Sequence, residues 1–141
     1  IPVEEAGPLR EALLRSALDP IYLVSPTTSP ERARAAGEAG RGFLYLISRA
    51  GVTGARDSLA DGLPDLVGRV RAVTSLPLAV GFGLSRPEHV QAVAGVADAA
   101  VVGSALVSVI ADAGDSPALA PRVEQFVRWL RGADAAGELR G

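Results

Sequence analysis

Four short apolar runs, each followed by a stretch with helical periodicity, constrain the fold of this chain most. The runs span residues 21–24, 42–48, 76–81 and 99–103. They lack the polar alternation of a half-exposed strand, and such runs are typical of parallel strands that are covered on both faces. They recur roughly every thirty residues, which is a spacing that right-handed parallel β-α-β units produce. The pattern predicts an α/β fold in which four parallel strands alternate with helices.

Helical periodicity and start signals place helices before, between and after these runs. The clearest start is Ser29-Pro30-Glu31, where serine can cap the helix, proline fits the first helical position and glutamate favours the positive end of the helix dipole. Each predicted strand is followed by a helix. The predicted helices span residues 3–18, 30–39, 64–73, 86–93, 104–111 and 117–130.

Four parallel strands are half of an eight-stranded (β/α)8 barrel, also called a TIM barrel. An open four-stranded parallel sheet leaves two unpaired edges, which soluble proteins normally cover or pair. We therefore predict that residues 1–141 form one domain, a half-barrel that another segment or another copy of the chain completes. The sequence begins with Ile1 and contains no methionine, so we expect a further segment to precede it.

The composition of the chain excludes several classes of partner and site. Its 141 residues are 48% hydrophobic with a net charge of -2, which is ordinary for a soluble domain with a core. Basic and acidic residues are spread without blocks, which disfavours nucleic acid and membrane surfaces as partners. Without cysteine there is no disulfide or thiolate metal site. With no apolar run near ~20 residues and no signal-peptide pattern, we expect a cytoplasmic protein.

Glycine-bearing turns follow the last two predicted strands. Gly81, Phe82 and Gly83 end one strand, and Gly103 and Ser104 end the next and open a helix. Glycine lets the backbone approach an anion closely, and amides at a helix start bind phosphate. Taken singly, the first turn could be a plain strand-to-helix connection and Ser104 a plain N-cap. On consecutive strands of one barrel, the two turns predict a site for a phosphorylated small molecule.

Two further features fit a binding site less specifically. Thr53 and Gly54 lie in a long glycine-bearing loop that suits a lid over a substrate, although a surface loop without a task has the same composition. Tyr45 lies within a predicted strand, where its ring could face either the barrel mouth or the core.

His89 lies at a helix start far from any carboxylate pair, which favours a surface histidine over a catalytic one.

Three segments, in this order and at these separations, resemble the second half of the tryptophan synthase alpha subunit. They are GRGFLYLISRAGVTGAR, LPLAVGFGLSRPEHV and ADAAVVGSALVSVI, and the resemblance extends over essentially the whole chain. It implies strands five to eight of a TIM barrel, with the N-terminal half missing. It also implies an indole-3-glycerol phosphate aldolase of tryptophan biosynthesis, which cleaves its substrate to indole and glyceraldehyde 3-phosphate by a retro-aldol reaction without a cofactor.

The resemblance also assigns roles to individual residues. Tyr45 would line the indole end of the pocket, and Thr53 in the lid would hydrogen-bond the family's catalytic aspartate. The phosphate would be held by Gly54, Phe82, Gly83, Gly103 and Ser104.

The family's catalytic glutamate and aspartate belong to the first half of the barrel and have no counterpart in this chain. We therefore assign no catalytic residue here and expect the chain to be inactive alone. The resemblance implies two partners, the N-terminal half of the barrel and a pyridoxal-phosphate-dependent β subunit that receives indole through a tunnel.

Two alternatives to this assignment stay open. The chain could be a non-catalytic half-barrel that self-associates and binds phosphate or a β subunit. It could also belong to another phosphate-binding barrel lyase or isomerase of the same superfamily.

Overall fold

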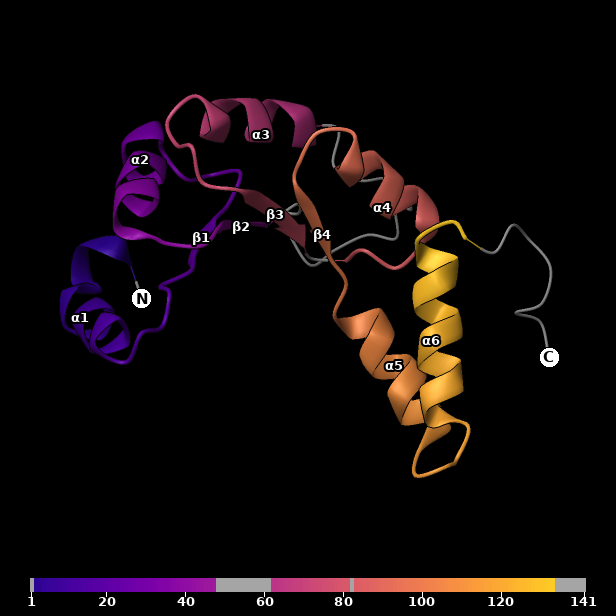
Figure 1. Ribbon diagram of the computed structural model, residues 1–141. Coiled ribbons are helices and arrows are strands. Elements are labelled where there is room, and N and C mark those ends of the chain that lie inside the picture. Colours follow the sequence, from indigo (N-terminus) through magenta and orange to yellow (C-terminus); the bar gives the residue numbers. More distant parts are fainter. Residues whose placement is uncertain (1, 48–61, 82, 134–141) are drawn as a thin grey trace.

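The computed structural model describes residues 2–47, 62–81 and 83–133, in which parallel strands and helices alternate along the chain (Figure 1). The strands are β1 (Tyr22–Val24), β2 (Leu44–Ile47), β3 (Leu78–Gly81) and β4 (Ala99–Val101). The helices are α1 (Gly7–Arg15), α2 (Pro30–Ala39), α3 (Leu63–Arg71), α4 (Pro87–Ala94), α5 (Ser104–Ala113) and α6 (Leu119–Leu130), preceded by a 3-10 turn, η1 (Val3–Glu5). The predicted order of elements is confirmed.

The helix predicted over residues 3–18 is wrong in its extent. The structure divides it into η1 and α1, because Pro8 in the first turn of α1 has no amide to continue a helix that started earlier. At the other end, Ala17 adopts a left-handed conformation with φ 54°. The amides of Ala17 and Leu18 then bond back to the carbonyls of Leu14 and Leu13, a pairing that closes a helix end.

Helix α2 begins as its sequence predicts. The Ser29 hydroxyl accepts a hydrogen bond from the Arg32 amide, and Pro30 is the first helical residue. The Arg32 side chain donates to both carboxylate oxygens of Glu4, at 2.9 and 3.3 Å, and so joins the N-terminal turn to α2.

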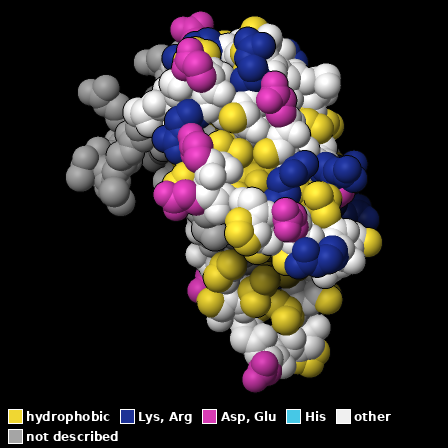
Figure 2. All heavy atoms as spheres, turned by 90° about the vertical axis from the view of Figure 1, so that its left-hand side faces the viewer, with side chains coloured by type: hydrophobic (Ala, Val, Ile, Leu, Met, Phe, Trp, Pro, Cys, Tyr) yellow, Lys and Arg dark blue, Asp and Glu magenta, His cyan; other side chains and the backbone are white. Residues whose placement is uncertain are grey.

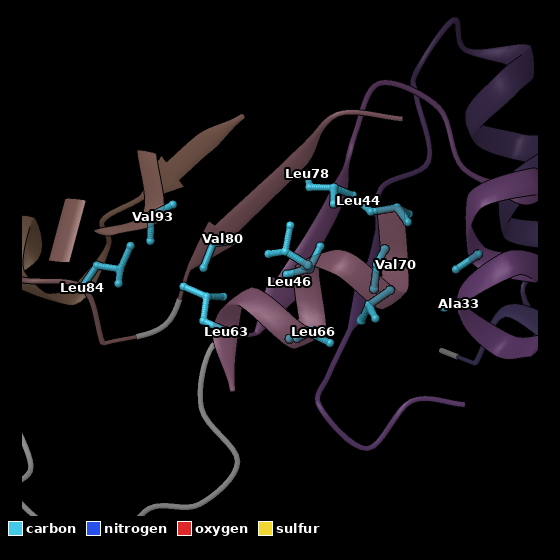
Figure 3. Close-up of a cluster of buried hydrophobic side chains, with 13 residues drawn as sticks. Ala33, Leu44, Leu46, Leu63, Leu66, Val70, Leu78, Val80, Leu84 and Val93 are labelled. Carbon is cyan, nitrogen blue, oxygen red and sulfur yellow. The ribbon is translucent and has the colours of Figure 1, made fainter. Parts of the chain in front are cut away.

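The four strands form one parallel sheet in sequence order, with β1 and β4 at its edges. Helices α2, α3 and α4 lie along one side of this sheet (Figure 1). The side chains that meet beneath them form the core, which Figure 3 shows in close-up. Its sheet residues are Val24, Leu44, Leu46, Leu78 and Val80, and its helix residues are Ala33, Ala36, Leu63, Leu66, Val67, Val70 and Val93.

The alternate positions of β1 and β2 carry Leu23, Tyr45 and Ile47, which face the other side of the sheet. Leu23 is 62% exposed there, although its neighbour Val24 is 1% exposed on the helix-covered side. An apolar sheet face without a helical cover is what half of a barrel presents toward the barrel interior.

Helices α5 and α6 pack against each other and extend away from the sheet beyond β4 (Figure 1). Val107 and Ile110 on α5 are 63% and 42% exposed, and Val127 on α6 is 40% exposed. Figure 2 shows hydrophobic side chains gathered on the lower part of the molecule, where these two helices lie. None of the helices in the described residues is long and apolar enough to cross a membrane.

Asp98 joins three elements at the N-terminal edge of the sheet. Its carboxylate accepts hydrogen bonds from the Leu78 amide and from the Arg71 guanidinium, both at 2.7 Å. The Asp98 amide donates in turn to the Leu78 carbonyl at 3.0 Å. The Leu78 amide, and after it Arg71, lower the pKa of the Asp98 carboxyl from its ordinary value of 3.8.

The lowered pKa of Asp98 predicts how stability changes in acid. Because the ionised form is favoured in the folded state, its contribution is present above pH 3.8 and is lost as the pH falls toward the lowered folded-state pKa. We expect Asp98→Asn to destabilise the protein at neutral pH and to lose this part of the acid dependence. Urea unfolding at a series of pH values measures both effects. Asp112→Asn, on the exposed surface of α5, is the matched control, and equal pH profiles for all three proteins would contradict the prediction.

Candidate functional site

Strand register brings the two glycine-bearing turns to one edge of the sheet. Gly81, the last residue of β3, pairs with Val101, the last residue of β4. Because the strands are parallel, the residues that follow them, Gly83 on one side and Gly103-Ser104 on the other, leave the same carboxyl edge. Barrel enzymes bind and convert their substrates at this edge.

The start of α5 presents backbone donors at this edge. Gly103 occupies the N-cap position, and the first hydrogen bond of the helix runs from the Val107 amide to the Gly103 carbonyl at 3.0 Å. Within the described residues, the amides of Ser104, Ala105 and Leu106 have no acceptor. Such amides at the positive end of a helix dipole are suited to an anion. The alternative that Ser104 is itself the N-cap is wrong, because Ser104 is the first helical residue.

Gly103 leaves the approach to these amides open. Among the described residues, apart from Gly103 and its chain neighbours, no heavy atom lies within 4 Å of the position that a Cβ on this residue would take. Ser104 beside it is exposed.

The turn after β3 is held in a conformation that requires glycine. Gly83 has φ 77°, in the left-handed region that side chains disfavour, and it is exposed. The next residue, Leu84, is 2% exposed and belongs to the core. Gly83 therefore lies at the surface of a turn that the buried Leu84 side chain anchors to the core.

Tyr45 lies on the open face of β2, between Leu23 of β1 and Ala79 of β3 in register. Its phenol ring extends over Gly81, so that a Cβ on Gly81 would stand only 2.5 Å from the Tyr45 Cζ atom and would also collide with the hydroxyl. Tyr45 is half-buried and lies outside the helix-covered core. Its ring therefore reaches the start of the turn that carries Gly83.

The remaining candidates lie outside the described residues. These are Thr53 and Gly54 of the expected lid, and Phe82. Among the residues that are described, no group of three or more His, Cys, Asp or Glu side chains could hold a metal ion.

The prediction from the sequence missed one part of this site, the close contact of the Tyr45 ring with Gly81. A glycine inside a strand often marks a close approach by another group, and that signal was available in the run at residues 76–81. The partner is 36 positions earlier in the chain, so local pattern alone does not identify it.

These features define a class, half of a parallel (β/α)8 barrel whose strands end in backbone amides that have no acceptor within the part of the chain that the structure describes. A family model described as tryptophan synthase alpha chain matches residues 1–133. The chain belongs to the tryptophan synthase alpha chain family.

Two relatives show the extent of the match. The tryptophan synthase alpha chain of Solibacter usitatus is 44% identical over 129 residues, which are 92% of this chain and 48% of that relative. The tryptophan synthase alpha chain of Chloroflexus aurantiacus is 50% identical over 107 residues, which are 76% of this chain and 40% of that relative. The chain thus spans about half the length of the curated relatives that it matches.

Solved structures agree with the sequence relatives. A chain of the tryptophan synthase α2β2 complex of Pyrococcus furiosus is similar with a TM-score of 0.82 and 33% identity, over 93% of this chain and 52% of that one. A chain of the open form of M. tuberculosis tryptophan synthase is similar with a TM-score of 0.76 and 34% identity, over 97% of this chain and 49% of that one. The predicted family and the predicted half-barrel are both confirmed.

The contact between Tyr45 and Gly81 predicts a coupled pair of substitutions. Gly81→Ala forces the Tyr45 ring to move, and overpacking of this kind costs about 1–3 kcal/mol of unfolding free energy. Removing the ring as well, in Gly81→Ala/Tyr45→Ala, leaves room for the new methyl group, so the two changes together should cost less than the sum of their separate costs. Urea unfolding of the four proteins measures the coupling. Gly103→Ala, at the open strand end, is the control without a steric clash, and strictly additive costs would contradict the prediction.

Proposed function

We propose that this chain is the half of an indole-3-glycerol phosphate aldolase that binds the phosphate and lines the indole pocket. One observation carries the proposal: the Gly83 turn and the start of α5, with the amides of Ser104 to Leu106, follow neighbouring strands at the same carboxyl edge of the sheet in a chain of the tryptophan synthase alpha family. Residues 1–141 would form one domain, the C-terminal half of the barrel.

The phosphate would lie between the two strand ends. Amides at the start of α5 donate along the helix axis, where the dipole favours a negative group. Gly83 allows a second backbone segment to approach from β3, and the Ser104 hydroxyl adds a side-chain donor. The family resemblance would add Gly103, Phe82 and Gly54 to the residues that hold the phosphate, and of these Phe82 and Gly54 lie outside the described residues.

Tyr45 would contact the indole ring on the open face of the sheet. Its ring lies beside the β3 turn, so it would be close to the ligand while the phosphate is held at the strand ends. Thr53 would act from the lid, where it would orient the catalytic aspartate. Both roles follow the family resemblance and the position of β2 in the sheet.

The acid and the base would come from the N-terminal half of the barrel. Cleavage of the bond between indole C3 and the glycerol chain requires a proton on indole C3 and removal of the proton from the adjacent hydroxyl group. Within the described residues, no carboxylate pair stands at the carboxyl edge of the strands. Joined to that half, the chain would take part in a carbon-carbon lyase of tryptophan biosynthesis in the cytoplasm.

A β subunit would be the second protein partner. The similar Pyrococcus furiosus chain comes from a tryptophan synthase α2β2 complex. We infer that pyridoxal phosphate belongs to that β subunit and that this chain itself holds no cofactor.

A charge at the start of α5 tests the phosphate site. Ser104→Glu places a carboxylate at the helix N-terminus, where it suits the dipole but repels a phosphate. We expect the affinity for sn-glycerol 3-phosphate to fall at least about tenfold while the stability of the protein is retained. Titration followed by amide NMR measures the affinity and shows whether Gly83, Ser104 and Ala105 respond.

Ser108→Glu is the matched control, because it adds the same charge one turn further along α5. Wild-type protein that leaves these three amides unshifted at millimolar ligand would refute the phosphate site. Equal loss of affinity in Ser104→Glu and Ser108→Glu would show that the added charge repels the ligand by long-range electrostatics and not at the start of α5.

The exposed apolar surface favours a second candidate function, a half-barrel that pairs with another copy of itself. Leu23 is 62% exposed on the open sheet face, and β1 and β4 are edge strands to which another sheet can add. If this candidate is correct, the 141-residue polypeptide forms a dimer that Leu23→Asp disrupts, and light scattering measures its mass. A monomer that associates instead with an N-terminal half-barrel rejects it.

A further inference from the structure

Two contacts of the described residues fix the turn between β3 and α4, and one of them involves His89, the single histidine of the chain. Leu84 fixes the turn from within, since its side chain is buried in the core. The Ser85 amide fixes it from the helix side, because it donates a hydrogen bond to Nδ1 of His89 at 3.3 Å. Gly83, the exposed residue of the candidate site, directly precedes these two points.

His89 makes this bond from a position that suits it. It is the third residue of α4, and side chains at that position can reach back to amides that precede the helix. The N-cap residue of α4 is Arg86, whose guanidinium has only donors and therefore cannot accept a hydrogen bond from an amide. The imidazole thus accepts from the amide that precedes the N-cap residue, which a side chain at the third helical position can reach.

The bond also defines the state of the imidazole ring. An amide N–H can be accepted only by a ring nitrogen with a free lone pair, so Nδ1 carries no proton in this arrangement. His89 is half-buried, and its assignment as a non-catalytic histidine stays a prediction.

The position of the turn determines the direction of its backbone donors. An anion bound by amides gains most when those amides are already oriented, because no ordering is then needed on binding. The Ser85 amide is two residues from Gly83, so a restraint on Ser85 limits how far the Gly83 peptide can rotate. Without it, the Ser85 amide loses this acceptor, while the buried Leu84 side chain still anchors the turn.

We propose that His89 is a positioning residue for phosphate binding. Through the Ser85 amide it holds the Gly83 turn in its binding conformation, and it does so without contacting the ligand. This inference rests on the proposed phosphate site at the carboxyl edge of β3 and β4.

Two substitutions separate this role from a general effect on folding. His89→Leu keeps a side chain of helical preference but removes the acceptor. His89→Asn keeps an acceptor, since its Oδ1 is the same number of bonds from the backbone as Nδ1. The experiment uses the full polypeptide that the cell produces, with sn-glycerol 3-phosphate as the ligand. We expect the dissociation constant of this ligand to rise about three- to tenfold for His89→Leu. For His89→Asn we expect it to stay close to that of the wild type.

NMR of the imidazole nitrogens gives a second readout, which needs no assignment because the chain has one histidine. We expect Nδ1 to be unprotonated in the free protein and its signal to shift with the same half-saturation as the amides of the site. Thermal unfolding of both variants shows whether any change in affinity merely follows a loss of stability.

Each outcome decides between the site and the role of His89. If the wild type does not bind glycerol phosphate, the proposed function fails and this inference fails with it. If the wild type and His89→Leu bind equally, the phosphate site stands and the inference is overturned. The inference is also overturned if both variants lose affinity together, or if Nδ1 is protonated in the free protein.

Discussion

Parallel pairing between β3 and β4 is the constraint on which the rest of the molecule depends. The register that sets Gly81 opposite Val101 makes both strands end together, so that two backbone turns leave the sheet side by side. The opposite edge is held by Asp98, which joins the first residue of β3 to the approach to β4. One edge of the sheet thus serves stability, and the other is left to carry backbone donors.

The two faces of the sheet differ for a related reason. Side chains alternate along a strand, so the residues that build the core beneath α2, α3 and α4 leave their neighbours on the other face. Those neighbours are apolar as well, as Leu23 and Ile47 show, and strands that are apolar on both sides belong inside a closed barrel. The open face that carries Leu23 thus lies on the same sheet as the candidate site at its carboxyl edge.

Much of the fold could be predicted because its signals are local. Apolar runs indicated the strands, and Ser29 with Pro30 indicated the start of α2. The division of the first helix was missed because the periodic leucines outweighed Pro8. The part of the candidate site that could be predicted is the pair of turns with glycine at the strand ends. Two contacts were not predicted. The contact of Tyr45 with Gly81 joins positions that are distant in the sequence. The hydrogen bond from the Ser85 amide to His89 uses histidine where serine or glutamate is the usual signal.

The space that Tyr45 takes above Gly81 has a consequence for how this family can diverge. As long as an aromatic ring occupies position 45, a side chain at position 81 has to displace it, so replacing Gly81 costs stability. A lineage that first shortens residue 45 removes this restriction, and position 81 then becomes free to vary. The less costly route is therefore the one in which residue 45 of strand β2 changes before residue 81 of strand β3.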